Sequence, residues 1–282
     1  MSADTDTTQI RPTDTSGRRK HAASQSRWAE FRRNKLGSYA ALVALLVTWQ
    51  TWVTVGEVNP IVMPSPVAVA GEMVRMYELG FLVPAFIQSF SAYFAGIALA
   101  ISVGMAISIG IGLSKLAQVV TQPYLWALFA MPRVALIPLL MLWFGLNRQM
   151  VVMTVFLSAV VPLVLQVIEG MRTADGTLVR MSQVFCAGRI ATLWKVVLPG
   201  IVPFVANGMR QSLSRGFIGL IVVELLTGTG GLGTEATRAA TNFNTARTMA
   251  MIFIMLIVAV LLVILSKALE RSASRWRETV AV

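Results

Sequence analysis

The chain contains long runs of apolar residues without charge, and these runs constrain its fold more than any other feature. A hydrocarbon core about 30 Å thick requires roughly 20 apolar residues for each crossing helix. Six stretches approach or exceed this size, some with internal interruptions: Leu36–Gly56, Leu79–Ser114, Leu116–Pro132 with Val134–Asn147, Val151–Ile168, Ile201–Leu226 and Thr248–Ser266. We therefore predict an all-α, polytopic membrane protein with about six transmembrane helices.

The composition supports a membrane location and explains the high positive charge. With 56% hydrophobic residues and a mean hydropathy of +0.69, the chain is too apolar for a water-soluble globule of 282 residues. The net charge of +11 could indicate nucleic-acid binding, but Lys and Arg gather in the first 35 residues, in the loop 170–200 and near the C-terminus. Cytoplasmic loops retain such residues, so we expect both termini to be cytoplasmic, membrane lipid as a partner, and no nucleic acid.

Two domains are predicted from the change in composition along the chain. Residues 1–34 are rich in Thr, Ser and Arg and poor in large apolar side chains, which predicts a disordered, basic cytoplasmic tail. Residues 35–282 are predicted to form one transmembrane domain.

Local signals refine the helices of this domain. Ser65 and Pro66 are typical of a helix start, and Gly80 of its end, so a short surface helix is expected before the second run. Small residues recur at every fourth position of the second run, from Ala92 to Gly112, which favours close helix packing within the protein over a dimer seam. Pro132 is expected, with Pro138, to break the third run.

Three arginines fall within or beside the predicted spans: Arg133, Arg210 and Arg215. Ionisable groups at membrane depth usually face a cavity or a partner. The planar guanidinium fork suits the oxygens of carboxylate, sulfonate or nitrate, so these arginines are candidates to line the path of an anionic solute. The alternative is structural, with Arg210 and Arg215 paired to Glu224 or to backbone carbonyls.

The loop 170–200 carries an amphipathic pattern. Met181 and Phe185 recur at helical spacing, and Leu193 and Trp194 follow before Pro199. An amphipathic segment outside the bilayer fits a groove on a partner protein, whereas packing on the protein's own spans is the alternative.

These loop residues resemble the coupling loop of bacterial ABC-importer permeases of the binding-protein-dependent type I family. That loop reads Glu-Ala-Ala, three residues, Gly, nine residues, an aliphatic residue, one residue and Leu-Pro. Anchored on Leu198-Pro199, the pattern places Val196 at the aliphatic position, Cys186 at the glycine and Arg180-Met181-Ser182 at Glu-Ala-Ala. The end of the pattern matches this sequence, whereas Arg180-Met181-Ser182 and Cys186 differ from the Glu-Ala-Ala and Gly at its beginning. Similarity to the nitrate/sulfonate/taurine subfamily extends to four further segments: Met63–Pro66, Ile137–Gly145, Gly208–Arg215 and Gly219–Leu225.

The resemblance implies a type I ABC-importer permease fold and a multi-pass subunit of the bacterial inner membrane. The implied function is ATP-driven import of a small solute, anionic in this subfamily: a sulfonate, nitrate, taurine or another organic acid. Implied partners are a second permease copy in a homodimer, two cytoplasmic ABC ATPase subunits and an extracytoplasmic solute-binding protein. The residues expected to contact the ATPase are Arg180, Met181, Ser182, Phe185, Cys186, Gly188, Leu193, Trp194, Leu198 and Pro199.

The sequence contains no phosphate-cradling Gly-x4-Gly-Lys-Ser/Thr, so we expect ATP and Mg²⁺ to be bound by the partner ATPase, and no cofactor by this chain. Because we find no nucleophile-base pair, metal-ligand cluster or paired carboxylates, we predict a non-catalytic subunit without a metal site. Gly228–Gly233 matches a dinucleotide fingerprint but follows an apolar span, and is expected to be a flexible extracytoplasmic turn. The alternatives are a gradient-driven secondary transporter or channel, which would favour an inverted repeat that we do not see, and a membrane-embedded enzyme.

Overall fold

The computed structural model describes residues 37, 40–173, 181–182, 184–186 and 188–274, and all their regular elements are helices. The chain divides into two compact units, residues 1–58 and 59–282. The first unit contains the apolar helix Ala40–Val55. The tail predicted over residues 1–34 lies outside the described residues.

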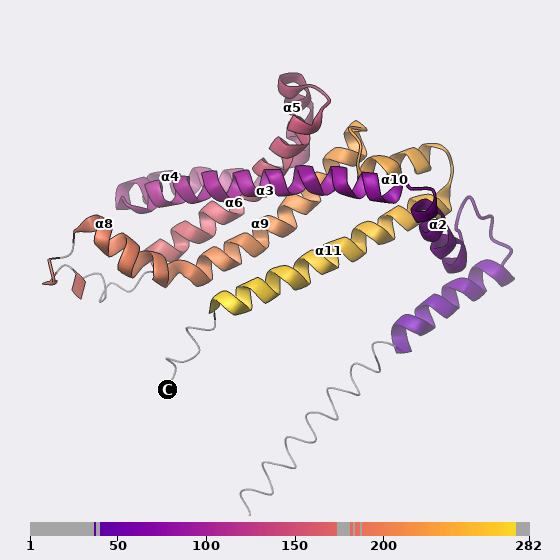
Figure 1. Cartoon of the computed structure of the whole chain (residues 1–282), viewed down its shortest axis with the longest axis horizontal. Coiled ribbons are helices and arrows are strands. Elements are labelled where there is room, and N and C mark those ends of the chain that lie inside the picture. Colours follow the sequence, from indigo (N-terminus) through magenta and orange to yellow (C-terminus); the bar gives the residue numbers. More distant parts are fainter. Residues whose placement is uncertain (1–36, 38–39, 174–180, 183, 187, 275–282) are drawn as a thin grey trace, which may run out of the picture. The chain divides into compact units, whose positions relative to one another are not determined.

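The second unit is built from a sequence of helices and short helical turns. In Figure 1, α3, α6, α9 and α11 run along one another, with α2 and α10 at one end and α8 at the other. The elements are α2 (Pro66–Glu78), α3 (Leu82–Gly112), α4 (Lys115–Ala130), the 3₁₀ turn η1 (Arg133–Leu136), α5 (Ile137–Phe144), α6 (Arg148–Arg172), α8 (Arg189–Thr192), the π-helical turn η2 (Leu193–Val197), α9 (Leu198–Thr227), α10 (Leu232–Thr241) and α11 (Thr245–Ser274).

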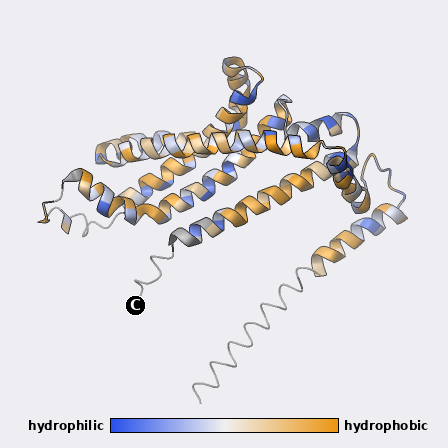
Figure 2. Ribbon diagram, viewed as in Figure 1, coloured by the Kyte–Doolittle hydropathy of each residue, from blue (hydrophilic) through white to orange (hydrophobic). Residues whose placement is uncertain are grey.

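Four of the described helical segments are long and apolar enough to cross a membrane, and they contain α3, α6, α9 and α11. A fifth crossing arises if α4 and the segment Arg133–Phe144 form one broken span, bent by 88°. The helix Ala40–Val55 is apolar but shorter. The all-α membrane fold is therefore confirmed, whereas the count of six stays a prediction. Figure 2 shows hydrophobic residues along most of α11, while hydrophilic ones gather on α10.

The core of the second unit lies around α6, which packs mainly against α9 and α3. Val155, Ala159 and Leu163 recur at four-residue spacing along α6 and are fully buried. The small-residue stripe of α3 packs onto this surface, because a Cβ added at Gly96 would lie 2.7 Å from Val155. The stripe thus serves packing within the protein, as predicted.

Local signals place the ends of α2 and the break before η1 correctly. The Ser65 hydroxyl accepts a hydrogen bond from the Ala68 N–H at 3.2 Å, and Gly80 has φ +72° just after the helix. At the break, Met131 and Pro132 adopt extended backbone conformations between α4 and η1. Proline has no N–H and disfavours a helical residue before it, which explains why the helix ends there.

Candidate functional site

A cavity of about 330 Å³ lies where the break between α4 and η1 faces α6 and α9. Its wall is mostly apolar, and its polar side chains come from three elements: Arg133 from η1, Thr154 and Ser158 from α6, and Arg215 from α9. The apolar wall consists of Phe129, Ala130, Met131, Pro132, Val134, Ile137, Ile218, Gly219 and Val222. Cavities of this size and character hold small molecules in many proteins. We call it the arginine cavity.

The broken helix holds Arg133 at the wall of the arginine cavity. Its Nε donates a hydrogen bond to the Leu157 carbonyl of α6 at 3.2 Å. Its Nη2 is buried and has no hydrogen-bond partner among the described residues. The Nε side of the guanidinium is therefore anchored, and Nη2 remains available to donate to a ligand.

Arg215 enters the same cavity from α9. Its guanidinium carbon lies 4.8 Å from the centroid of the Phe129 ring, a cation–π contact that keeps the side chain at the wall. In the part of the chain that the structure describes, neither Arg133 nor Arg215 has a carboxylate within ion-pair distance. Two positive charges in one partly apolar cavity repel each other, so an anion bound between them would be stabilised.

The two hydroxyl groups of the cavity were not identified from the sequence. Thr154 and Ser158 lie one helical turn apart on α6, and both are at least 96% buried. Thr154 Oγ1 donates to the Met150 carbonyl at 2.9 Å, but Ser158 Oγ has no partner among the described residues. Two hydroxyl residues at four-residue spacing within an apolar span were the available sequence signal.

Arg210, the third arginine predicted for the solute path, is not among the residues that line the arginine cavity. Its Nε lies 3.0 Å from a carboxylate oxygen of Glu270 in α11. Its Nη2 donates to Asn207 Oδ1 at 2.8 Å, and Asn207 Nδ2 donates to Gln166 Oε1 of α6 at 3.0 Å. This chain of polar contacts joins three spans, which favours the structural alternative for Arg210, with Glu270 instead of Glu224 as its partner.

Glu224 is 1% exposed and is held at the start of α10. The Ser89 hydroxyl lies 2.7 Å from Oε1, and the Gly233 N–H donates to Oε2 at 2.9 Å. Gly231 has φ +95°, and a Cβ there would collide with the Glu224 carboxylate, so this position requires glycine. The turn 228–233, which we expected to be flexible, is instead closely packed.

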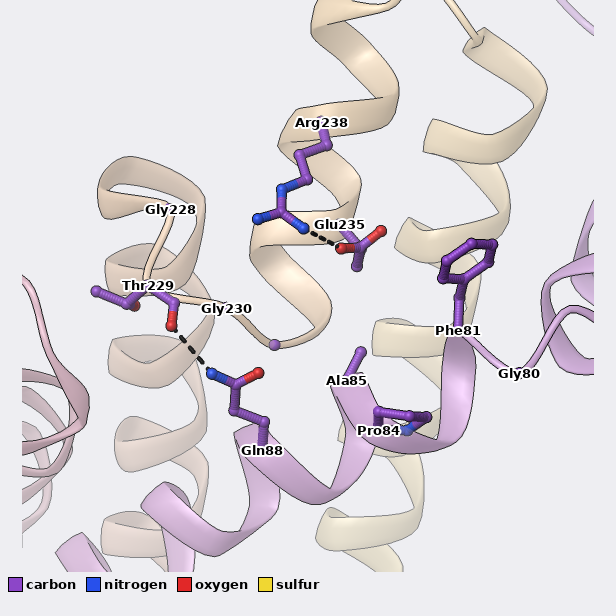
Figure 3. A pocket seen from close by; sticks show the side chains of 11 residues that line it. Gly80, Phe81, Pro84, Ala85, Gln88, Gly228, Thr229, Gly230, Glu235 and Arg238 are labelled. Atoms are coloured by element: carbon purple, nitrogen blue, oxygen red, sulfur yellow. Dashed lines mark hydrogen bonds and ion pairs between the residues drawn. The ribbon is translucent and has the colours of Figure 1, made fainter.

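A second cavity, of about 360 Å³, lies between this turn, the start of α3 and α10. Figure 3 shows Gln88 reaching toward the turn, where its amide donates to the Thr229 carbonyl at 3.0 Å. Arg238 pairs with Glu235 at 2.7 Å, and Arg247 pairs with the same carboxylate at 3.1 Å. Because Arg238 already has a carboxylate partner, this second cavity is less suited to bind an anion than the arginine cavity is.

Neither cavity brings together the ligands of a metal ion. No group of three or more His, Cys, Asp or Glu side chains that could hold one occurs in the described ranges. The expected lack of a cofactor and of a metal site stays a prediction.

The described part of the loop 170–200 presents apolar side chains on its surface. The exposed fraction exceeds half for five of them: Met181, Val184, Phe185, Ile190 and Trp194. Ser182 Oγ and Thr192 Oγ1 lie 3.0 Å apart and connect the two halves of the loop. This surface is compatible with the predicted partner contact.

The remaining loop residues of the prediction differ in exposure. Cys186 and Gly188 are exposed, and Cys186 has φ +54°, a left-handed conformation rare for a residue other than glycine. Leu193 and Leu198 are half-buried, and Pro199 is exposed. Arg180 lies outside the described residues.

Comparison with known proteins places this geometry in a family. Residues 96–275 match the family described as "Binding-protein-dependent transport system inner membrane component". The taurine transport system permease protein TauC of Escherichia coli (strain K12) is 28% identical, covering 89% of this chain and 92% of TauC. The riboflavin transport system permease protein RibX of Chloroflexus aurantiacus is 30% identical, covering 86% of this chain and 90% of RibX.

A solved structure shares the fold. A chain of the MetNI methionine ABC transporter, in an inward-facing conformation, superposes with a TM-score of 0.60 at 16% identity. The match covers 69% of this chain and 96% of the MetNI chain. The likeness shows that the bundle described above shares the fold of that chain.

Proposed function

Because the chain belongs to the family of binding-protein-dependent transport system inner membrane components, we propose that it is the membrane-spanning permease subunit of an ATP-driven importer. Members of this family are transport permeases that work with ATPase and solute-binding partners, and they are not themselves enzymes. In this proposal the chain supplies the solute pathway and catalyses no reaction. It resides in the inner membrane with both termini in the cytoplasm, as its charge distribution favours.

The proposed solute is small and anionic. The relatives differ in the solutes for which they are named, taurine in one case and riboflavin in another, so their names alone do not select a solute class. The observation that carries the proposal is the convergence of Arg133 and Arg215 on one cavity without a carboxylate among the described residues. A positive charge at membrane depth is costly unless it is paired, and an anionic solute would pair it during transport.

The proposed assembly contains two copies of this chain, two cytoplasmic ATPase subunits and an extracytoplasmic solute-binding protein. ATP and Mg²⁺ are bound by the ATPase subunits. The loop side chains Phe185 and Trp194, 80% and 67% exposed, form the contact with the ATPase. Closure of the ATPase pair supplies the free-energy difference that moves the permease between its inward-open and outward-open states.

Reconstitution of the assembly in proteoliposomes tests the proposal. We expect uptake of a small sulfonate, the chemical class to which taurine belongs, to require the ATPase, ATP and the binding protein. Arg133→Gln is expected to lower uptake at least tenfold and Arg133→Lys to restore part of it, because Lys keeps the charge without the planar fork. Recovery of the complex and basal ATP hydrolysis serve as controls for folding. Full uptake by this chain alone from an ion gradient would instead identify a secondary transporter.

A further inference from the structure

We propose that the arginine cavity selects a tetrahedral oxyanion head group, of the sulfonate type, over a carboxylate, and that Ser158 is the residue that makes the distinction. The inference rests on the proposed function, because it assigns a head group to the solute that the permease moves. It adds a specificity-determining hydroxyl that the sequence did not reveal.

The Ser158 hydroxyl differs from most of its counterparts in the described spans. In an apolar helix, a serine or threonine hydroxyl commonly donates to the carbonyl four residues earlier. Ser102, Ser108 and Thr154 do so, with oxygen–oxygen distances of 2.7, 2.6 and 2.9 Å. Ser158 is 2% exposed, and its hydroxyl makes no such bond within the described residues. A buried hydroxyl without a partner carries an unfavourable desolvation free energy, which a bound acceptor would remove.

The second unpaired donor, Arg133 Nη2, belongs to the same part of the cavity. Arg133 Nε is bonded to the carbonyl of Leu157, the residue that precedes Ser158 in α6. This bond fixes the guanidinium beside the helical turn that carries the Ser158 hydroxyl. Gly219 of α9 closes over the same turn, since a side chain at 219 would collide with the Ser158 hydroxyl.

Three donor groups therefore approach the cavity from three elements: Arg133 from η1, Ser158 from α6 and Arg215 from α9. A carboxylate offers two oxygens in one plane, and a single guanidinium fork can engage both of them. A sulfonate offers three oxygens around a tetrahedral centre, so the third oxygen can accept from the Ser158 hydroxyl. The apolar wall, with Ile218 and Val222, fits the short hydrocarbon part of such a solute.

A matched pair of solutes tests the assignment. Ethanesulfonate and propionate have the same two-carbon chain and differ in the head group. Their dissociation constants would be measured by equilibrium dialysis with the whole permease–ATPase complex in lipid nanodiscs, without the binding protein, so that only the cavity discriminates. Ser158→Ala is expected to weaken ethanesulfonate binding about tenfold and to leave propionate binding unchanged, as loss of one hydrogen bond to a charged group implies.

Two further variants make the result specific. Ser108→Ala removes a buried hydroxyl that is already bonded within α3 and should change neither dissociation constant. Arg133→Gln should weaken the binding of both solutes. Ser158→Ala should also raise the melting temperature of the complex slightly, because it removes an unpaired polar group, and this separates lost binding from misfolding.

The assignment would be overturned if Ser158→Ala weakened the binding of both solutes equally, or if the unaltered complex bound ethanesulfonate no more tightly than propionate. Either result would leave the proposal of an anion permease in place. Absence of ATP-dependent anion uptake by the unaltered assembly would instead refute the proposed function itself.

Discussion

Arg210 in α9 and Glu270 in α11 form an ion pair with a nitrogen–oxygen distance of 3.0 Å. The pair lies outside the arginine cavity and continues through Asn207 to Gln166 of α6. It therefore connects α6, α9 and α11, and we assign it to stability instead of solute recognition.

This assignment predicts that Arg210→Gln and Glu270→Gln each lower the free energy of unfolding by about 0.5–1 kcal/mol, the range of a partly exposed ion pair. The Michaelis constant for solute uptake should stay unchanged in both variants. The exchanged pair Arg210→Glu with Glu270→Arg should recover part of the stability, which a melting curve of the purified complex would show. A rise in the Michaelis constant of Arg210→Gln alone would return this residue to the solute path.

A second prediction concerns the exposed aromatic side chains of the loop. Phe185→Asp and Trp194→Asp should each abolish co-purification of the ATPase, because a charge placed in an apolar contact costs several kcal/mol unless it is paired. The membrane domain should stay folded, since both side chains are largely exposed here. Phe243→Asp, at the opposite end of the bundle and 76% exposed, is the matched control. Undiminished ATPase recovery with both loop variants would place the contact elsewhere.

How much of this structure the sequence could predict depends on how local each signal is. The apolar helices α3, α6, α9 and α11, the cap at Ser65 and the break at Pro132 follow from residues close together in the chain, and the structure has them where they were expected. The similarity of the loop to a known pattern identified the family before any tertiary contact was known. Each of these inferences needs only a few neighbouring residues.

The arginine cavity needed information that no local pattern holds. Arg133 and Arg215 are 82 positions apart in the chain, and only the packing of η1 and α9 on α6 brings them to one wall. Arg210, five residues before Arg215, faces α11 instead, because residues five apart on a helix do not share a face. The rotation of each helix about its own axis thus decides which arginine lies beside a carboxylate.

The left-handed backbone of Cys186 leads to a third prediction. The coupling-loop pattern that this loop resembles has glycine at the position of Cys186, and φ +54° accounts for it, since a Cβ destabilises this conformation by about 1–2 kcal/mol. Cys186→Gly should therefore stabilise the loop and keep or improve ATPase affinity, whereas Cys186→Val should weaken it. Gly200→Ala is the control, because Gly200 lies outside the predicted contact, has no positive φ and has no atom within 4 Å of an added Cβ. Pull-down of the ATPase at increasing concentration would measure all three, and stronger binding by Cys186→Val would contradict the prediction.

The last prediction tests the packing that holds α3 against α6. A Cβ at Gly96 would lie 2.7 Å from Val155 Cβ and 2.8 Å from the Val152 carbonyl oxygen, so Gly96→Ala must separate the two helices. Overpacking of this kind costs about 1–3 kcal/mol, and the melting temperature and yield of the complex should fall. Gly110 lies on the same helix with nothing within 4 Å of an added Cβ, so Gly110→Ala should raise helix stability by about 0.5–1 kcal/mol. Opposite signs for the same substitution on one helix would establish that α3 packs on α6 as described, and a similar effect of both variants would show that it does not.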